Sequence, residues 1–227
     1  NAFDSAPDWL ATTTVETING TPSRALVIAD LAHVLWAVNM GVLGLHVWPF
    51  RASNPEDHDE MRIDLDPSPG VTFDMVRESA GHVRDLLAEY GMIGFPKTTG
   101  SKGIHVYVRV EPGWDSFAVR GAVVTIGREL ARRHPELITD KWWKEERGTR
   151  VFVDYNQNAP HKNMFGAWGA RPRVGAQVST PFGWDELDTI DPEAMTIDTV
   201  PSRLLERGDP WELMDDTAVS IASLVER

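Results

Sequence analysis

Apolar residues recur at the spacing of an α-helix in three parts of the chain. The first run follows Asp30, a residue type that caps helices, and stops at Gly41. Its apolar side chains stand at i, i+3, i+4 and i+7: Leu31, Val34, Leu35 and Val38. The same periodicity predicts a second helix over about 72–90, which ends at Gly91, and a third helix near 117–133.

Short or alternating apolar runs predict β-strands between these helices. Residues 104–110 are the clearest case, because apolar side chains alternate there with His105, Tyr107 and Arg109, as in a half-buried strand. Further strands are expected at 26–28, 42–50, 61–66 and 150–155, and a Pro- and Gly-rich loop continues to about 183. The alternation of strands and helices indicates a mixed α/β or α+β fold, and we expect residues 1–227 to form a single domain.

The strand within "MRIDLDPSPG", residues 61–70, carries two carboxylates on one face. Asp64 and Asp66 are two positions apart, and strand side chains point to opposite faces with period two. Two like charges side by side repel each other, so a positive group is the simplest compensation. The alternative interpretation is a pair of surface aspartates on a solvated strand.

A third carboxylate, Asp154 in "RVFVDYN", ends another short apolar strand. Three carboxylates on strand edges are able to hold two divalent cations about 3.5–4 Å apart, the arrangement that serves phosphoryl transfer. Ligation by oxygen alone favours Mg²⁺ or Mn²⁺ over zinc. The carboxylates Asp64, Asp66 and Asp154 are therefore the candidate metal ligands.

The stretch "TTGSKGIH", residues 98–105, has the composition of a phosphate-binding loop. Two glycines allow the backbone to approach a ligand, and the side chains between them supply hydroxyls and an ammonium group: Thr99, Ser101 and Lys102. The stretch lacks the spacing of a Walker A loop, and a Gly-rich turn with a solvated lysine is the alternative. His105 follows on the polar side of its strand, where a structural histidine is favoured over a ligand contact.

Two further stretches contain candidate binding residues. His46 in "GLHVWPF" shares a strand face with Trp48, and a packed histidine is the alternative to a ligand contact there. The run "NQNAPHKNMFGAWGARPR", residues 156–173, brings cationic side chains directly after the third carboxylate: Lys162, Arg171 and Arg173. Long basic loops are usually solvated, but adjacency to a candidate metal ligand favours a role for this one.

Charge and composition restrict the setting. The net charge of −12 opposes binding to a phosphate backbone, but acidic residues gather at 53–60 and after 185, while 97–109 and 141–173 hold many of the basic ones. We interpret the acidic segments as solvated surface and the basic ones as a groove. The absence of cysteine excludes disulfides, thiolate zinc sites and a cysteine nucleophile, and fits a reducing cytoplasm.

The sequence also bears on membrane association and on where the chain begins. No apolar run approaches the roughly 20 residues that span a bilayer, so no membrane partner is expected. The opening "NAFDSAPDWL" has the features of neither a signal peptide nor a normal translation start. We therefore expect the chain to begin inside a longer protein.

Taken together and in order, the motifs resemble a known family. "DLD" before a Pro turn, "TTGSKGIHVYV", "RVFVDYNQN" and "WGARPR" resemble the polymerase domain of bacterial ligase D, a branch of the archaeo-eukaryotic primase superfamily. "PDWL", "LHVWPF", "TPFGWDEL" and "VPSRLLERGDPWELM" are similar to the same family, so the resemblance covers nearly the whole chain. It implies a primase-like α+β core with central mixed or antiparallel sheets flanked by helices.

The resemblance also implies an activity. Members are template-dependent nucleotidyltransferases of non-homologous end joining that favour ribonucleotides, act on DNA ends or gaps, use two Mn²⁺ or Mg²⁺ ions, and work with the end-binding protein Ku and a DNA ligase. The family has a further segment before "PDWL" that this chain lacks, and a Pro-Tyr-Ser run where this chain has "FGAWGARPR". Two alternatives stay open, a non-catalytic DNA-end-binding module and a metal-dependent phosphohydrolase.

The resemblance implies roles for individual residues. Asp64, Asp66 and Asp154 would be the catalytic metal ligands. The incoming NTP or dNTP would be bound by a set of polar side chains: His46, Thr99, Ser101, Lys102, Gln157 and Arg171. Candidate contacts to DNA or nucleotide are His105, Lys162 and Arg173.

Overall fold

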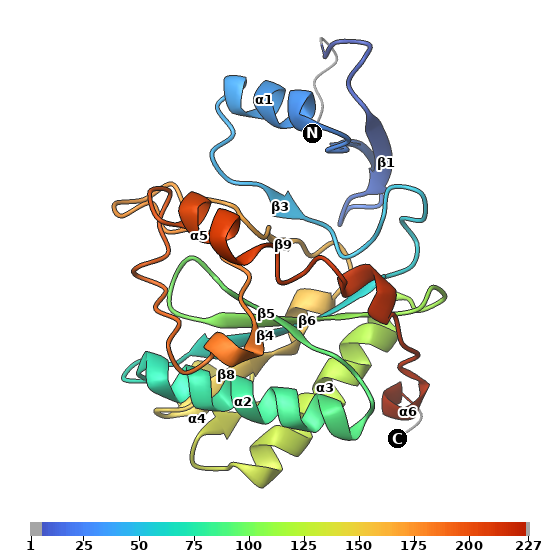
Figure 1. Ribbon diagram of the computed structural model, residues 1–227. Helices are drawn as coiled ribbons and strands as arrows, with labels where there is room; N and C mark the ends of the chain where they lie inside the picture. The colour runs from blue at the N-terminus through green and yellow to red at the C-terminus, as the bar shows by residue number, and fades with distance from the viewer. Residues whose placement is uncertain (1–5, 226–227) are drawn as a thin grey trace.

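A mixed five-stranded sheet forms the centre of the protein. The computed structural model describes residues 6–225, and Figure 1 shows the sheet with helices on both sides. The strand order is β5 (Phe95–Thr98), β6 (Ile104–Arg109), β4 (Glu60–Pro67), β8 (Val151–Asp154) and β7 (Ile138–Thr139). All neighbours are antiparallel except β7 and β8. The mixed α/β fold predicted from the sequence is therefore confirmed.

The two long predicted helices are present and begin where the sequence supplies capping residues. In α2 (Phe73–Glu89), the Thr72 side chain accepts a hydrogen bond from the backbone N–H of Met75. In α3 (Ser116–Arg133), Asp115 accepts one from Ala118. Each cap satisfies a backbone donor that has no partner within its helix.

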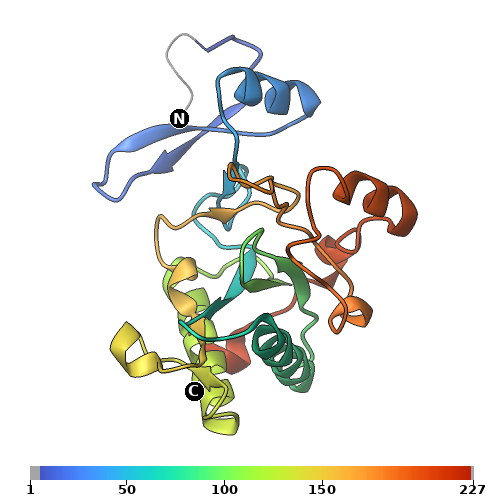
Figure 2. The ribbon, with the colours of Figure 1, turned by 90° about the vertical axis from the view of Figure 1, so that its left-hand side faces the viewer.

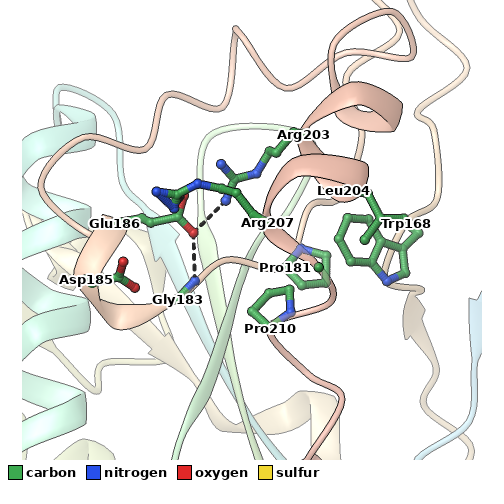
Figure 3. Close-up of a pocket in the computed structure, with 10 residues that line it drawn as sticks. Trp168, Pro181, Gly183, Asp185, Glu186, Arg203, Leu204, Arg207 and Pro210 are labelled. Atoms are coloured by element: carbon green, nitrogen blue, oxygen red, sulfur yellow. Dashed lines mark hydrogen bonds and ion pairs between the residues drawn. The ribbon is translucent and has the colours of Figure 1, made fainter.

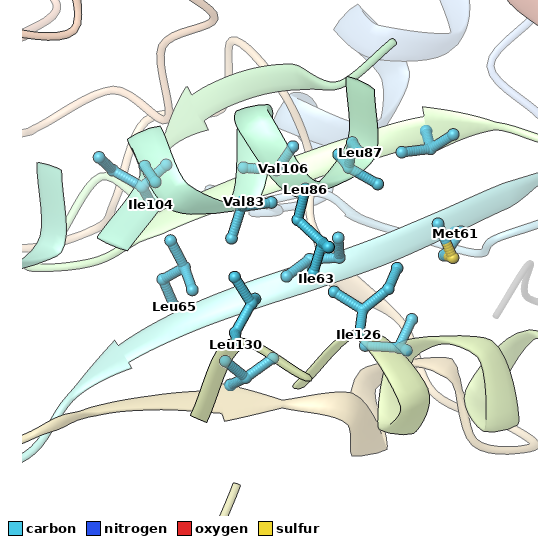
Figure 4. Close-up of a cluster of buried hydrophobic side chains, with 14 of the residues drawn as sticks. Met61, Ile63, Leu65, Val83, Leu86, Leu87, Ile104, Val106, Ile126 and Leu130 are labelled. Atoms are coloured by element: carbon cyan, nitrogen blue, oxygen red, sulfur yellow. The ribbon is translucent and has the colours of Figure 1, made fainter. Parts of the chain in front are cut away.

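The main hydrophobic core lies between these two helices and the sheet (Figure 4). Met61, Ile63 and Leu65, the alternate residues of β4, are fully buried there. They pack with apolar side chains of the neighbouring strand and both helices, among them Val83, Leu86, Leu87, Ile104, Val106, Ile126 and Leu130. This packing fixes which face of β4 points to the core, and so directs Asp64 and Asp66 to the opposite face.

The other face of the sheet is covered by a two-stranded ribbon of β3 (His46–Val47) and β9 (Met164–Phe165), seen above the sheet in Figure 1. Arg62 of β4 is fully buried beneath this ribbon. Its guanidinium donates hydrogen bonds to the carbonyls of Val47 (3.0 Å) and Trp48 (2.7 Å) and pairs with Glu60 (2.7 Å). The ribbon is thus tied to the strand that carries the carboxylates.

The N-terminal elements stand apart from the central sheet (Figure 2). They are β1 (Thr12–Glu16), β2 (Pro22–Leu26) and α1 (Leu31–Asn39), of which the β1–β2 hairpin was not predicted. The helix begins at the predicted cap Asp30, but its apolar stripe is not buried: Leu31 is 69% and Leu35 59% exposed. The buried side chains of α1 are His33 and Ala37.

The remaining elements are short. They are α4 (Lys144–Arg147), η1 (Tyr155–Asn158), η2 (Trp184–Glu186), α5 (Val200–Arg207), η3 (Met214–Thr217) and α6 (Ala222–Val225). The strand expected over 42–50 is reduced to β3, and the loop expected up to 183 contains η1 and β9. Among the helices within residues 6–225, none is long and apolar enough to cross a bilayer.

Two interpretations of polar segments were wrong. Strand β6 is not half-buried, because His105 and Tyr107 on its polar side are also buried, under the β3–β9 ribbon. The basic residues do not all line a groove, and the acidic segment is not all solvated. Arg109, for example, forms an ion pair with Asp59 (2.9 Å), whose side chain is only 14% exposed. Basic and acidic side chains of the two segments thus pair with each other within the fold instead of facing solvent or a ligand.

Gly103, at the entry to β6, provides a test of the sheet packing. A Cβ at this position would lie 2.6 Å from the backbone oxygen of Leu65 in β4. We expect Gly103→Ala to lower the free energy of unfolding by about 1–3 kcal/mol, because the neighbouring strand must move. The measurement is urea denaturation followed by circular dichroism.

Gly121, which lies in α3, supplies the matched control. A Cβ there meets no atom within 4 Å, so Gly121→Ala is expected to raise the unfolding free energy by about 0.5–1 kcal/mol. Equal stability of wild type and Gly103→Ala would contradict the close contact between β6 and β4.

Candidate active site

Four polar side chains form a row across one face of the central sheet. Lys97 of β5 is opposite His105 of β6, His105 is opposite Asp64 of β4, and Asp64 is opposite Asp154 of β8. Residues directly opposite in antiparallel strands share a face, with Cβ atoms about 4.5–5.5 Å apart. The register therefore places two of the three predicted carboxylates side by side.

Asp64 is the most buried carboxylate of the row, with 15% of its side chain exposed. Burial raises its pKa to about 7, although the positive charges of Lys97 and Arg171 act in the opposite direction. His105 Nε2 lies 3.4 Å from Asp64 Oδ1, and burial lowers the pKa of His105 well below its usual value, so the imidazole is neutral. Burial of Asp64 thus outweighs the effect of the Lys97 and Arg171 charges on its pKa, and a bound cation would further favour the ionised carboxylate.

Asp154 is oriented by the turn that follows it. Its Oδ1 accepts a hydrogen bond from the backbone N–H of Asn156 (2.8 Å), and its Oδ2 accepts one from Gln157 Nε2 (3.0 Å). Burial, and then the charge of Asp64, raise the pKa of Asp154. The Gln157 amide also acts to lower the pKa of Asp64, against the larger effect of burial.

Asp66 lies further along the same face and is less enclosed. Its side chain is 58% exposed, and Arg147 Nη1 lies 3.8 Å from its Oδ2. Within residues 6–225, no three His, Cys, Asp or Glu side chains are already gathered around a point that would hold a metal ion. Binding of two ions by Asp64, Asp66 and Asp154 stays a prediction, and the oxygen donors present are those that Mg²⁺ and Mn²⁺ prefer.

The loop 99–101 is held by two arginines from the loop after β9. Arg171 donates two hydrogen bonds to the carbonyl of Thr99, at 3.0 Å from Nε and 2.8 Å from Nη2. Arg173 donates to the carbonyl of Gly100 (2.7 Å) and to the hydroxyl of Ser101 (3.2 Å). The candidate phosphate-binding stretch 98–105 and the basic run 156–173 are therefore in direct contact.

The close approach of these loops depends on Gly100. Its φ is +65°, and an added Cβ would lie 3.0 Å from Arg171 Cγ and 3.2 Å from the backbone nitrogen of Ser179. Thr99 is buried, and its hydroxyl accepts hydrogen bonds from the backbone N–H groups of Ser101 and Gly103. The Thr99 hydroxyl therefore braces the loop, while Ser101 is only partly buried.

His46 reaches the same region from β3. Its ring packs edge-on against Phe165, with 5.3 Å between ring centroids, and the Arg171 guanidinium carbon is 3.8 Å from the centroid of the same ring. Partial burial, and then the charge of Arg171, lower the pKa of His46. His46 is exposed although its ring packs against an aromatic, so a ligand contact and a packed histidine both stay open for it.

The two remaining predicted lysines are exposed. Lys102 lies on the loop between β5 and β6, next to the residues that Arg173 holds. Lys162 is exposed beside His161, whose ring hydrogen-bonds to the carbonyl of Glu16 in the β1–β2 hairpin. Lys102 thus lies next to the loop 99–101 that the two arginines hold, and Lys162 lies near the N-terminal hairpin.

Lys97 is the member of the row that the sequence analysis missed. It is fully buried, a rare situation for a lysine, and burial lowers its pKa to about 7. No strand was predicted before the Gly-rich stretch 98–105, whereas "FPKT" forms β5. The short apolar run that precedes the loop was the feature of the sequence from which this buried strand was predictable.

A separate pocket lies beside α5 (Figure 3) and contains none of the predicted site residues. Glu186 in this pocket accepts hydrogen bonds or ion pairs from Gly183 N–H (3.0 Å), Arg203 (2.6 Å) and Arg207 (2.7 Å). Glu186 therefore pairs with both arginines of this pocket. The carboxylate row and the loop pair form the stronger candidate active site.

Comparison with known proteins agrees with the resemblance seen in the motifs. Residues 1–211 match the family described as the LigD primase-polymerase domain. The chain belongs to this family. It is 34% identical over 225 residues to the multifunctional non-homologous end joining DNA repair protein LigD of Mycobacterium tuberculosis. It is 29% identical over 213 residues to the bifunctional LigD of Bacillus subtilis.

These alignments cover 94% and 93% of the chain but only 29% and 34% of the two relatives, so the chain spans about a third of their length. Among solved structures, the polymerase domain of M. tuberculosis ligase D in complex with DNA superimposes with a TM-score of 0.88. That match is 31% identical and covers 96% of this chain and 78% of the other. The fold is thus that of the LigD polymerase domain.

Proposed function

We propose that the chain is a template-dependent nucleotidyltransferase that adds nucleotides to DNA 3′ ends or gaps during non-homologous end joining. Membership of the LigD primase-polymerase family supports this reaction class, and the DNA in the M. tuberculosis structure supports the substrate. The observation that carries the proposal is the position of Asp64, which lies opposite Asp154 and close enough to Arg171 of the clamped loops for that charge to act on the Asp64 pKa.

Asp64, Asp66 and Asp154 would hold two divalent ions, Mn²⁺ or Mg²⁺. The fit rests on the all-oxygen donor set and on the buried, poorly compensated charge of Asp64. Such ions, when bound, lower the pKa of a 3′-hydroxyl and stabilise the charge that develops on the pyrophosphate. This role also explains how an acidic chain is able to face nucleic acid.

The other side chains of the site bind and orient the nucleotide. Lys102 and Arg171 offset the charge of the triphosphate, and Arg173 and Ser101 lie where they reach the same phosphates. Gln157, which donates a hydrogen bond to Asp154, keeps that carboxylate oriented. His46 contacts the nucleotide from the opposite side, on the face of Phe165.

The finer features of the reaction follow from the family resemblance alone. They are a preference for ribonucleotides, cooperation with Ku and with a DNA ligase, and action in the bacterial cytoplasm.

Primer extension tests the proposal. A labelled primer on a template with T at the first position should be extended with Mn²⁺ or Mg²⁺, and rATP should outcompete dATP. Preference for dATP would remove the ribonucleotide assignment but leave the reaction class. DNA binding without extension would favour an end-binding module, and release of phosphate without extension would favour a phosphohydrolase.

A further inference from the structure

The buried Lys97 has a set of contacts that the proposed chemistry does not use. Its side chain is fully buried, in the row that contains the carboxylates. Its Nζ donates hydrogen bonds to the backbone carbonyl of Phe165 in β9 (3.1 Å) and to the hydroxyl of Ser179 (2.6 Å). Ser179 in turn donates to the carbonyl of Thr98 (2.9 Å). The ammonium group thus joins β5 to both ends of the segment 165–179.

The Phe165 ring contacts both His46 and Arg171, two of the side chains proposed to bind the nucleotide. The His46 ring meets it edge-on, and the Arg171 guanidinium lies over it at 3.8 Å. Glycines surround the ring because a larger residue would collide with it: an added Cβ would be 2.6 Å from the ring at Gly44 and 2.9 Å at Gly169. A displacement of Phe165 therefore displaces His46 and Arg171 together.

The segment anchored by Lys97 also carries the arginine clamp. Arg171 and Arg173 lie between Phe165 and Ser179, the two acceptors of the Lys97 ammonium. Their hydrogen bonds fix the loop 99–101 that follows β5. Lys97 thus anchors the segment 165–179 to β5, and the two arginines anchor the loop 99–101 to that segment. Both connections are needed to keep the loop and the arginines in their relative positions.

We propose that Lys97 is a positioning residue for the incoming nucleotide, which fixes His46 and Arg171 through its hydrogen bonds to Phe165 and Ser179. The inference rests on the proposed nucleotidyl transfer. A positioning role also accounts for the retention of a charged group in a fully buried position, since an apolar side chain there would offer no donor to the carbonyl of Phe165.

Lys97→Met tests this role, because methionine keeps the length of the side chain but removes the donors. At saturating DNA, the nucleotide KM is expected to rise about threefold to tenfold, the effect of one or two lost hydrogen bonds, with kcat changed less than about twofold. Affinity for the nucleotide in the absence of DNA, measured by fluorescence titration, should fall by the same factor. Ser179→Ala, which removes one acceptor, should shift KM in the same direction by less.

Two controls separate positioning from other roles. Arg128→Met removes an exposed cation of α3 outside the site, and should leave nucleotide KM unchanged. Mn²⁺ affinity, measured by calorimetry, should be the same in wild type and Lys97→Met. A lower melting temperature with unchanged nucleotide KM would overturn the proposal in favour of a purely structural lysine. A loss of Mn²⁺ affinity with unchanged KM would overturn it in favour of a counter-ion to Asp64.

Failure of the proposed function is distinguishable from failure of this inference. Wild-type protein that extends no primer contradicts nucleotidyl transfer, whatever the variants do. Even if wild-type protein extends no primer, nucleotide affinity without DNA can be measured for Lys97→Met and for wild type. Equal binding by both would contradict the positioning role, and weaker binding by the variant would support it.

Discussion

Asp64→Asn is expected to lower the rate of primer extension by about a thousandfold or more. Asp64 lies between His105 and Asp154 in the row of polar side chains and is a proposed metal ligand with only 15% of its side chain exposed. Loss of a metal ligand removes several kcal/mol of transition-state stabilisation, and about 1.4 kcal/mol corresponds to a tenfold change in rate. Single-turnover extension with Mn²⁺ measures the effect.

The fold of this variant should persist, because asparagine has nearly the same shape and Asp64 lies on the face of β4 opposite the main core. Its melting temperature is therefore expected to be close to that of wild type. The matched control is Asp188→Asn, an exposed carboxylate outside the site, which should extend primers at the normal rate. Mn²⁺ affinity, measured directly by calorimetry, should fall for Asp64→Asn alone. Extension by Asp64→Asn at nearly the wild-type rate would refute the two-metal assignment.

Arg171→Ala is expected to reduce kcat/KM for the nucleotide by about tenfold to a hundredfold. Charge-assisted hydrogen bonds contribute roughly 1.5–3 kcal/mol each, and Arg171 also holds the carbonyl of Thr99 through two donors. Lys102→Ala should act in the same direction without disturbing the loop, because Lys102 is exposed. Steady-state extension at saturating DNA, with the nucleotide varied, measures both effects.

DNA binding in a salt series tests the competing role of these cations. A side chain that contacts the DNA backbone contributes about one unit to the slope of log affinity against log salt concentration. We expect slopes equal to wild type for Arg171→Ala and Lys102→Ala, and also for the control Arg128→Ala on α3. A shallower slope together with unchanged nucleotide dependence would place these residues in the DNA groove.

The local pattern of the sequence was sufficient to predict the elements that carry the carboxylates. The alternation in "MRIDLD" predicted that both aspartates lie on one face of the strand, and the structure buries Ile63 and Leu65 on the opposite face. The caps of α2 and α3 were predictable because a capping side chain bonds to a backbone group only a few residues away. The linear order of the motifs was sufficient to indicate the LigD primase-polymerase family, which comparison confirmed.

The burial of several side chains was not predicted, because the same residue type occurs in both buried and exposed positions. The helical spacing of α1 was correct, yet Leu31 and Leu35 are exposed because α1 lies away from the sheet that buries the other helices. Lysine is usually solvated, so nothing in "KTTGSKG" distinguished the buried Lys97 from the exposed Lys102. Burial of these residues depends on which distant segment covers them.

The sequence by itself determined the elements of β4, α2 and α3, the face of β4 on which Asp64 and Asp66 lie, and the family, because each depends on short-range spacing or motif order. Only the tertiary structure decided that Asp64 stands opposite Asp154, that Arg171 holds Thr99, and that Lys97 lies beneath Phe165. Strand register and loop contacts join residues far apart in the chain, and packing of the core selects among the registers that local patterns allow.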